Sequence, residues 1–91
     1  MYKLAITESY RKRAKKFFSK HAEMLSQYEK VLTLLCINPQ HPSLRLHKLS
    51  GKFKGLSSVS INLSYRLMIH FIIKKDLIVP IDIGSHDEVY E

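Results

Sequence analysis

The chain has 91 residues and a formal net charge of +7, from 15 Lys and Arg against 8 Asp and Glu. This length excludes two domains with separate hydrophobic cores, so we expect one domain over residues 1–91. A charge of this sign favours a polyanionic partner, such as nucleic acid, or an acidic protein.

Further classes of protein are excluded by the residue pattern. No apolar run approaches the ~18 to 20 residues of a membrane-spanning helix, and residues 1–10 lack the apolar core of a signal peptide. We therefore expect a cytoplasmic protein without a membrane partner. The single Cys36 cannot form an internal disulfide, which fits a reducing compartment. The histidines are scattered and no cysteine pair accompanies them, so we expect no metal or other cofactor.

The first half of the chain predicts one strand followed by two helices. Large apolar side chains occupy every second position of residues 2–6, as in a short strand with one buried face. Thr7 can cap a helix over Glu8–Lys20, whose apolar residues have helical spacing and whose outer side is basic. A second helix is predicted over residues 21–36, and Asn38-Pro39 ends it.

The second half of the chain predicts strands. After a loop with two prolines at residues 38–43, the apolar period changes to two. Alternating side chains then predict strands at about residues 58–63, 66–73 and 77–83. The element order β-α-α-β-β-β predicts an α+β domain of two layers, with both helices on the apolar face of a mainly antiparallel sheet.

The register of the last two predicted strands brings polar residues to one face. A three-residue turn at 74–76 would place Leu67 opposite Ile83 and Phe71 opposite Val79. Pro80 cannot donate a ladder hydrogen bond, so it marks an edge or a bulge. The face that the helices leave uncovered would then carry Arg66, Met68, His70 and Asp82.

Acidic residues are absent from the middle of the chain. Residues 30–75 contain eight Lys or Arg and no Asp or Glu. We expect this stretch to face nucleic acid, with Lys48, Lys52 and Lys54 as phosphate contacts. The alternative is that a basic chain of this length contains a stretch without Asp or Glu by chance.

Three side chains could cut RNA without a metal ion. Cleavage needs a base for the 2′-OH proton, a cation for the charged phosphorane and an acid for the leaving 5′-oxygen. Histidine titrates near neutrality and arginine keeps its charge, so His47, Arg66 and His86 suit these roles if they converge on the uncovered face. The residues alone also fit another interpretation. In it, the histidines are ordinary surface residues and Arg66 forms a structural ion pair with Asp82.

Three short motifs occur in order along residues 44–90. They are Leu-x-Gly at 49–51 followed by Gly55, Tyr-Arg-Leu at 65–67, and Gly-Ser-His-x-x-x-Tyr at 84–90. In these motifs and in its element order the chain resembles the RelE/ParE superfamily of bacterial toxins, most of all the YafQ and YoeB branches. The resemblance implies the RelE-like fold and the toxin of a type II toxin-antitoxin system. It further implies a ribosome-dependent endoribonuclease that cuts mRNA in the ribosomal A site and is silenced by a cognate antitoxin.

The resemblance also assigns roles to single residues. It implies that His47 is the general base, Arg66 the cation that stabilises the transition state and His86 the general acid. Tyr90 matches a residue that contacts or orients the nucleotide.

Three positions depart from the family pattern. Ser60 stands in place of a further catalytic histidine, Ser64 in place of an acid, and Asp82 in place of a basic residue. A carboxylate at position 82 would pair with Arg66 or repel RNA.

Two other functions stay open. A ParE-like toxin would inhibit DNA gyrase without an acid/base pair, and His47 and His86 argue against that branch. A basic module could also bind RNA or ribosomes without catalysis. If the chain is a toxin, we expect the antitoxin to lay an acidic or amphipathic segment across the basic face.

Overall fold

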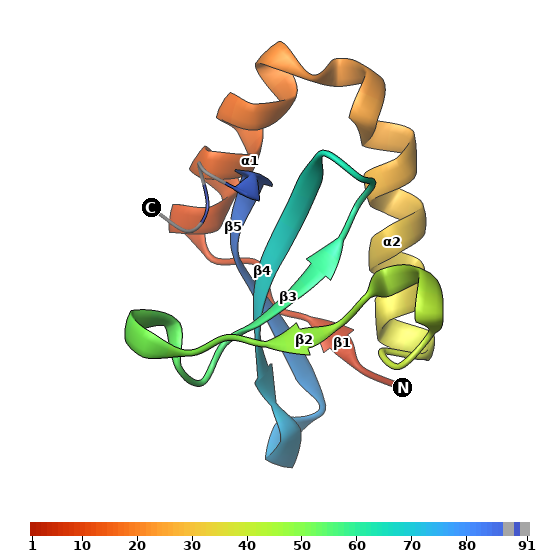
Figure 1. The fold of residues 1–91 in the computed structure, drawn as a ribbon, viewed down its shortest axis with the longest axis vertical. Coiled ribbons are helices and arrows are strands. Elements are labelled where there is room, and N and C mark those ends of the chain that lie inside the picture. The colour runs from red at the N-terminus through yellow and green to blue at the C-terminus, as the bar shows by residue number, and fades with distance from the viewer. Residues whose placement is uncertain (87–88, 90–91) are drawn as a thin grey trace.

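The computed structural model describes residues 1–86 and Val89. These residues form a sheet with strand order β1-β5-β4-β3-β2, in which β1 and β5 are parallel and all other neighbours antiparallel. Helices α1 (Glu8–Lys20) and α2 (Leu25–Ile37) run antiparallel to each other beside the sheet (Figure 1). The strands are β1 (Lys3–Leu4), β2 (His47–Lys48), β3 (Ser57–Ser60), β4 (Tyr65–Ile72) and β5 (Leu77–Ser85).

The α+β fold with two helices on a mainly antiparallel sheet is confirmed. One strand, β2, was not predicted, because its two residues are too few to produce an alternating pattern. It pairs with β3 at one edge of the sheet, with His47 opposite Ser58.

The start of the first helix agrees with the prediction, and that of the second does not. The Oγ1 atom of Thr7 accepts a hydrogen bond from the backbone N–H of Tyr10 at 3.1 Å, so Thr7 caps α1. The second helix was predicted to begin at residue 21, but His21 has φ −134° and ψ 50° and ends α1. A short 3-10 turn at Ala22–Met24 follows, and α2 begins at Leu25.

The hydrophobic core lies between the helices and one face of the sheet. Its central strand residues Leu67 and Ile69 are fully buried. The hydroxyls of Tyr10 on α1 and Tyr28 on α2 lie 2.8 Å apart inside it, which joins the two helices. Other buried members come from both helices, from the strands and from the connections between elements, namely Phe17, Val31, Leu35, Leu44, Val59, Ile61, Ile78 and Ile83.

The register of β4 and β5 changes part of the way along the pair. Leu67 is opposite Ile83, as predicted, but Phe71 is opposite Ile78 and not Val79. The prediction was wrong at that end because Met68 pairs with Asp82 whereas Ile69 pairs with Pro80, which leaves Ile81 as an extra residue. Such a bulge accommodates a proline without an N–H group, as the sequence indicated.

Cross-strand partners share a face of the sheet, so the register shows which residues turn away from the helices. The pairs between His47 and Ser58, Ser58 and Met68, and Met68 and Asp82 form one row across the sheet. We call the side of the sheet that carries these four residues and Arg66 the open face. Among the described residues, no helix combines the length and the apolar character needed to cross a membrane.

Candidate active site

His47 and Arg66 meet on the open face. The Nη2 atom of Arg66 on β4 lies 3.4 Å from Nδ1 of His47 on β2. The two strands are separated by β3, whose Ser58 pairs directly with His47. The structure therefore brings together two of the three residues that the sequence analysis selected for RNA cleavage.

Ser58 holds the guanidinium of Arg66 in place. The Nε atom of Arg66 donates a hydrogen bond of 2.8 Å to the Ser58 hydroxyl oxygen, and the Ser58 side chain is fully buried. This contact leaves Nη2 of Arg66 beside His47. Ser58 was not among the predicted site residues, although the alternating pattern of its strand placed it on the same face as Arg66.

The imidazole of His47 has two neighbours at the same nitrogen. Its Nδ1 lies 3.3 Å from the backbone oxygen of Arg45 and 3.4 Å from Arg66. A protonated Nδ1 donates to the Arg45 oxygen, and an unprotonated Nδ1 accepts from Arg66. Arg45 has a left-handed backbone with φ 49°, which sets the course of the chain just before β2. The exposed ring is thus held at one edge while remaining accessible.

His86 lies at the end of β5. Arg66 is opposite Gly84, so the chain reaches His86 two residues after passing Arg66, and the His86 side chain is exposed. Tyr90 lies outside the described residues.

The three lysines expected to contact phosphate occupy different places. Lys48 pairs with Ser57, which pairs with Ile69, so it projects toward the opposite side of the sheet from His47. Lys52 and Lys54 belong to the loop between β2 and β3, where Gly51 and Gly55 have φ 63° and 94°. Glycine adopts such backbone conformations without strain. Lys52 Nζ lies 5.2 Å from the centre of the Phe53 ring.

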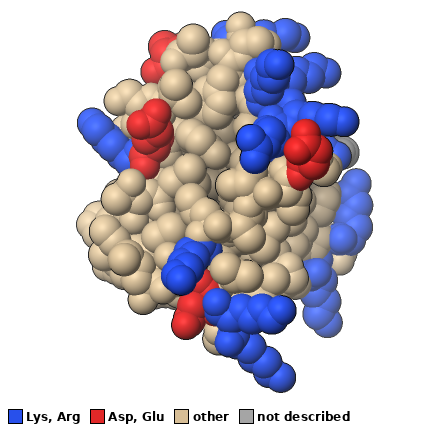
Figure 2. Space-filling model, turned by 180° about the vertical axis from the view of Figure 1, so that it is seen from behind, with Lys and Arg blue, Asp and Glu red and all other residues tan. Residues whose placement is uncertain are grey.

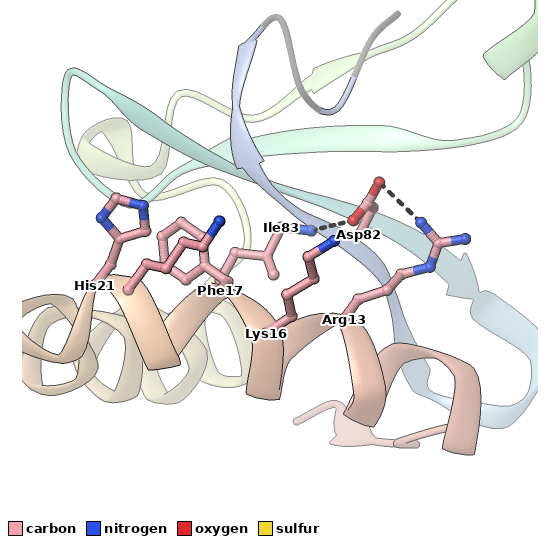
Figure 3. A pocket seen from close by; sticks show the side chains of 7 residues that line it. Arg13, Lys16, Phe17, His21, Asp82 and Ile83 are labelled. Carbon is pink, nitrogen blue, oxygen red and sulfur yellow. Dashed lines mark hydrogen bonds and ion pairs between the residues drawn. The ribbon is translucent and has the colours of Figure 1, made fainter.

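Asp82 does not pair with Arg66, in contrast to one expectation from the sequence. Its Oδ2 lies 3.4 Å from Nη1 of Arg13 on α1, and its Oδ1 accepts from the backbone N–H of Ile83 at 2.9 Å (Figure 3). The reason is geometric, since Gly84 and not Asp82 is opposite Arg66, and α1 packs against β5.

Basic charge is not confined to residues 30–75. In the space-filling view of Figure 2, most Lys and Arg side chains gather along one side of the molecule. Helix α1 contributes six exposed cations, which are Arg11, Lys12, Arg13, Lys15, Lys16 and Lys20. The positive surface therefore extends well beyond the stretch that the acid-free pattern indicated.

The part of the chain that the structure describes contains no group of three or more His, Cys, Asp or Glu side chains placed to hold a metal ion.

Comparison with known proteins gives a clear result at the level of structure. No family model and no curated protein sequence matches the chain. YafQ from E. coli strain BL21(DE3) is similar over 100% of both chains, with a TM-score of 0.81 and 17% identity. A copper-bound mutant toxin from Helicobacter pylori has a TM-score of 0.74 and 28% identity, over 99% of this chain and 100% of its own.

A third similar structure is a YoeB/ParE toxin from Agrobacterium tumefaciens. Its TM-score is 0.76 at 18% identity, over 92% of this chain and 98% of its own. The chain thus has the α+β fold of the RelE/ParE-like toxins, with YafQ and YoeB proteins as its structural relatives.

Proposed function

We propose that the protein is the toxin of a type II toxin-antitoxin system and that it cleaves mRNA in the ribosomal A site. The observation that carries this proposal is the contact of 3.4 Å between Arg66 and His47 on the open face. It unites a titratable nitrogen and a permanent cation, which are two of the three groups that metal-independent RNA cleavage needs. The fold shared with YafQ and YoeB toxins supports the same conclusion.

The reaction uses the RNA's own 2′-hydroxyl as nucleophile. His47 takes the 2′-OH proton, and the 2′-oxygen attacks the adjacent phosphorus. Arg66 stabilises the negative charge that develops on the phosphorane oxygens. His86 gives a proton to the 5′-oxygen as the P–O bond breaks, so the products are a 2′,3′-cyclic phosphate and a 5′-hydroxyl. The assignment of base to His47 and acid to His86 follows the family resemblance.

A cognate antitoxin completes the proposed system. Two of the similar structures are the E. coli DinJ-YafQ toxin-antitoxin complex and a YoeB-YefM complex from Staphylococcus aureus. We infer a comparable partner whose acidic segment covers the basic surface and blocks RNA. Because such a partner binds the folded toxin, it also raises the toxin's stability by mass action.

Cleavage by single-residue variants tests the proposal. We expect His47→Gln, Arg66→Gln and His86→Gln each to lower the rate of mRNA cleavage on programmed ribosomes by about 10²- to 10⁴-fold. His70→Gln is the matched control, because His70 is an exposed histidine of β4 on the same face as Arg66. It should cleave within about twofold of wild type, as expected for a substitution outside the reacting groups. The rate is measured by primer extension on ribosome-bound transcripts.

Brief expression in cells separates the proposed activity from the alternatives. Codon-linked mRNA ends that vanish in His86→Gln support the ribonuclease. Intact transcripts together with DNA damage would point to gyrase inhibition, and intact transcripts with intact DNA would leave a non-catalytic RNA or ribosome binder. Either of the last two results overturns the proposal.

A further inference from the structure

Asp82 places a carboxylate on the open face. It lies opposite Met68, in the same row as Ser58 and His47. A hollow on this side is lined by Lys52, Met68, Asp82 and Val89, and Arg13 of α1 also lines it. An RNA strand that leaves His47 and Arg66 along the row would meet the negative charge of Asp82.

Arg13 on α1 forms an ion pair with Asp82. Its Nη1 lies 3.4 Å from Asp82 Oδ2, while the second carboxylate oxygen accepts from the Ile83 N–H at 2.9 Å. The Arg13 side chain is 56% exposed and that of Asp82 is 22% exposed. Figure 3 shows Arg13 reaching from α1 toward the carboxylate. Both carboxylate oxygens are thus engaged, although the pair remains in contact with water.

Asp82 lies close enough to Arg66 for its charge to act on a phosphate bound there. Asp82 and Arg66 are diagonal neighbours on adjacent strands, because Met68 is opposite Asp82 and Gly84 is opposite Arg66. Diagonal positions on neighbouring strands are roughly 7–8 Å apart, about one Debye length at physiological salt. An unpaired carboxylate there would repel a phosphate bound at Arg66.

We propose that Arg13 is a positioning residue for RNA binding. Its guanidinium neutralises the Asp82 carboxylate and holds that carboxylate away from the bound RNA. The inference rests on the proposed function, since it concerns the same RNA. Without Arg13, the carboxylate of Asp82 would have no cation beside it in this ion pair and would repel a phosphate on the open face.

A double-mutant cycle on RNA affinity tests the proposal. We expect Arg13→Gln to weaken binding of a single-stranded RNA with a 2′-O-methyl group at the scissile position by about 3- to 10-fold. Asp82→Asn should bind as tightly as wild type or up to about threefold more tightly, and Arg13→Gln/Asp82→Asn should match Asp82→Asn, because no carboxylate remains to be neutralised. Arg13→Lys should restore most of the loss. Affinity is measured by fluorescence anisotropy over a series of KCl concentrations.

Arg11→Gln is the matched control. It removes one exposed cation from the same helix, and Arg11 pairs with Glu8 at 3.9 Å and not with Asp82. We expect its affinity to stay within about twofold of wild type, as for other surface substitutions. Thermal unfolding of every variant checks that binding is compared between folded proteins.

Two results would overturn the inference. If Arg13→Gln weakens binding as much in the Asp82→Asn background as in wild type, Arg13 contacts RNA directly. If Arg13→Gln binds like wild type, the carboxylate does not face the RNA. Cleavage assayed in parallel keeps the two proposals apart, because a wild-type protein that binds RNA without cutting it contradicts only the proposed activity.

Discussion

Ser58 determines where the Arg66 guanidinium points. Its buried hydroxyl accepts from Arg66 Nε, which leaves Nη2 beside His47. Arginine presents several donors in one rigid plane, so a single anchored nitrogen orients the others. A hydroxyl that never meets the substrate can in this way affect the reaction.

Ser58→Ala should therefore slow cleavage more than it weakens RNA binding. We expect kcat to fall about 5- to 20-fold, because loss of a hydrogen bond to a charged group leaves Arg66 free to move. The KM should change by less than about twofold, since the charge of Arg66 remains. Single-turnover cleavage of ribosome-bound mRNA separates the two effects.

Ser60→Ala is the control for that experiment. Ser60 is a buried serine of the same strand, but its hydroxyl donates to the backbone oxygen of Asn62. Equal losses in Ser58→Ala and Ser60→Ala would show that general damage to β3, and not the orientation of Arg66, slows the reaction.

At the scale of elements, a pair of phenols joins the two helices. The Tyr10 and Tyr28 hydroxyls lie 2.8 Å apart in the core. Burial, chiefly, raises the pKa of each phenol above its usual value of 10.0. The folded protein therefore keeps both phenols neutral at a pH where an unfolded chain would ionise them.

Because the pKa of both phenols is raised, we expect the free energy of unfolding to decrease as the pH rises above about 10. The folded pKa is raised, so the stabilisation is complete below the unfolded pKa and is lost as pH rises above it. We expect the free energy of unfolding to fall more steeply between pH 9 and pH 11 in wild type than in Tyr10→Phe. At pH 7 the variant should be about 1 kcal/mol less stable, from the lost hydrogen bond. Urea unfolding at each pH measures both quantities, and identical pH slopes would contradict the prediction.

At the scale of the whole molecule, cations are spread over more than one surface. Those of α1 lie in the helix layer, whereas Lys52 and Lys54 lie in the loop between β2 and β3. Only charges that touch RNA release counterions on binding, so the salt dependence of affinity can identify the face in contact.

Lys52→Gln and Lys54→Gln should each reduce the slope of log affinity against log salt by about 0.7, the value for one contact with single-stranded nucleic acid. Lys30→Gln should leave the slope unchanged, because Lys30 is an exposed lysine of α2 on the side of the helices. Titrations between 50 and 300 mM KCl, a range of roughly six-fold, resolve such a difference. A decrease for Lys30→Gln equal to that for Lys52→Gln would mean that RNA has no preferred face.

Local pattern was sufficient to predict the α+β class, the Thr7 cap of α1, the pairing of Leu67 with Ile83 and a bulge or edge at Pro80. Each depends on neighbours in sequence, on spacing, or on the missing N–H of proline. Side-chain chemistry, a place beside or on the predicted strands and the family resemblance also singled out His47 and Arg66, which lie in contact in the structure.

Other features depend on residues that meet only after the chain has folded. The two residues of β2 become a strand through pairing with β3, and the extra residue at Ile81 shifts the register beyond Met68. Ser58 reaches Arg66 across neighbouring strands, and Arg13 reaches Asp82 from a helix 69 positions away in sequence. Periodicity carries no information about such partners, because it records only which side of its own element a residue occupies. The sequence by itself therefore determined the layers and the candidate residues, while tertiary packing decided which charge stands beside which.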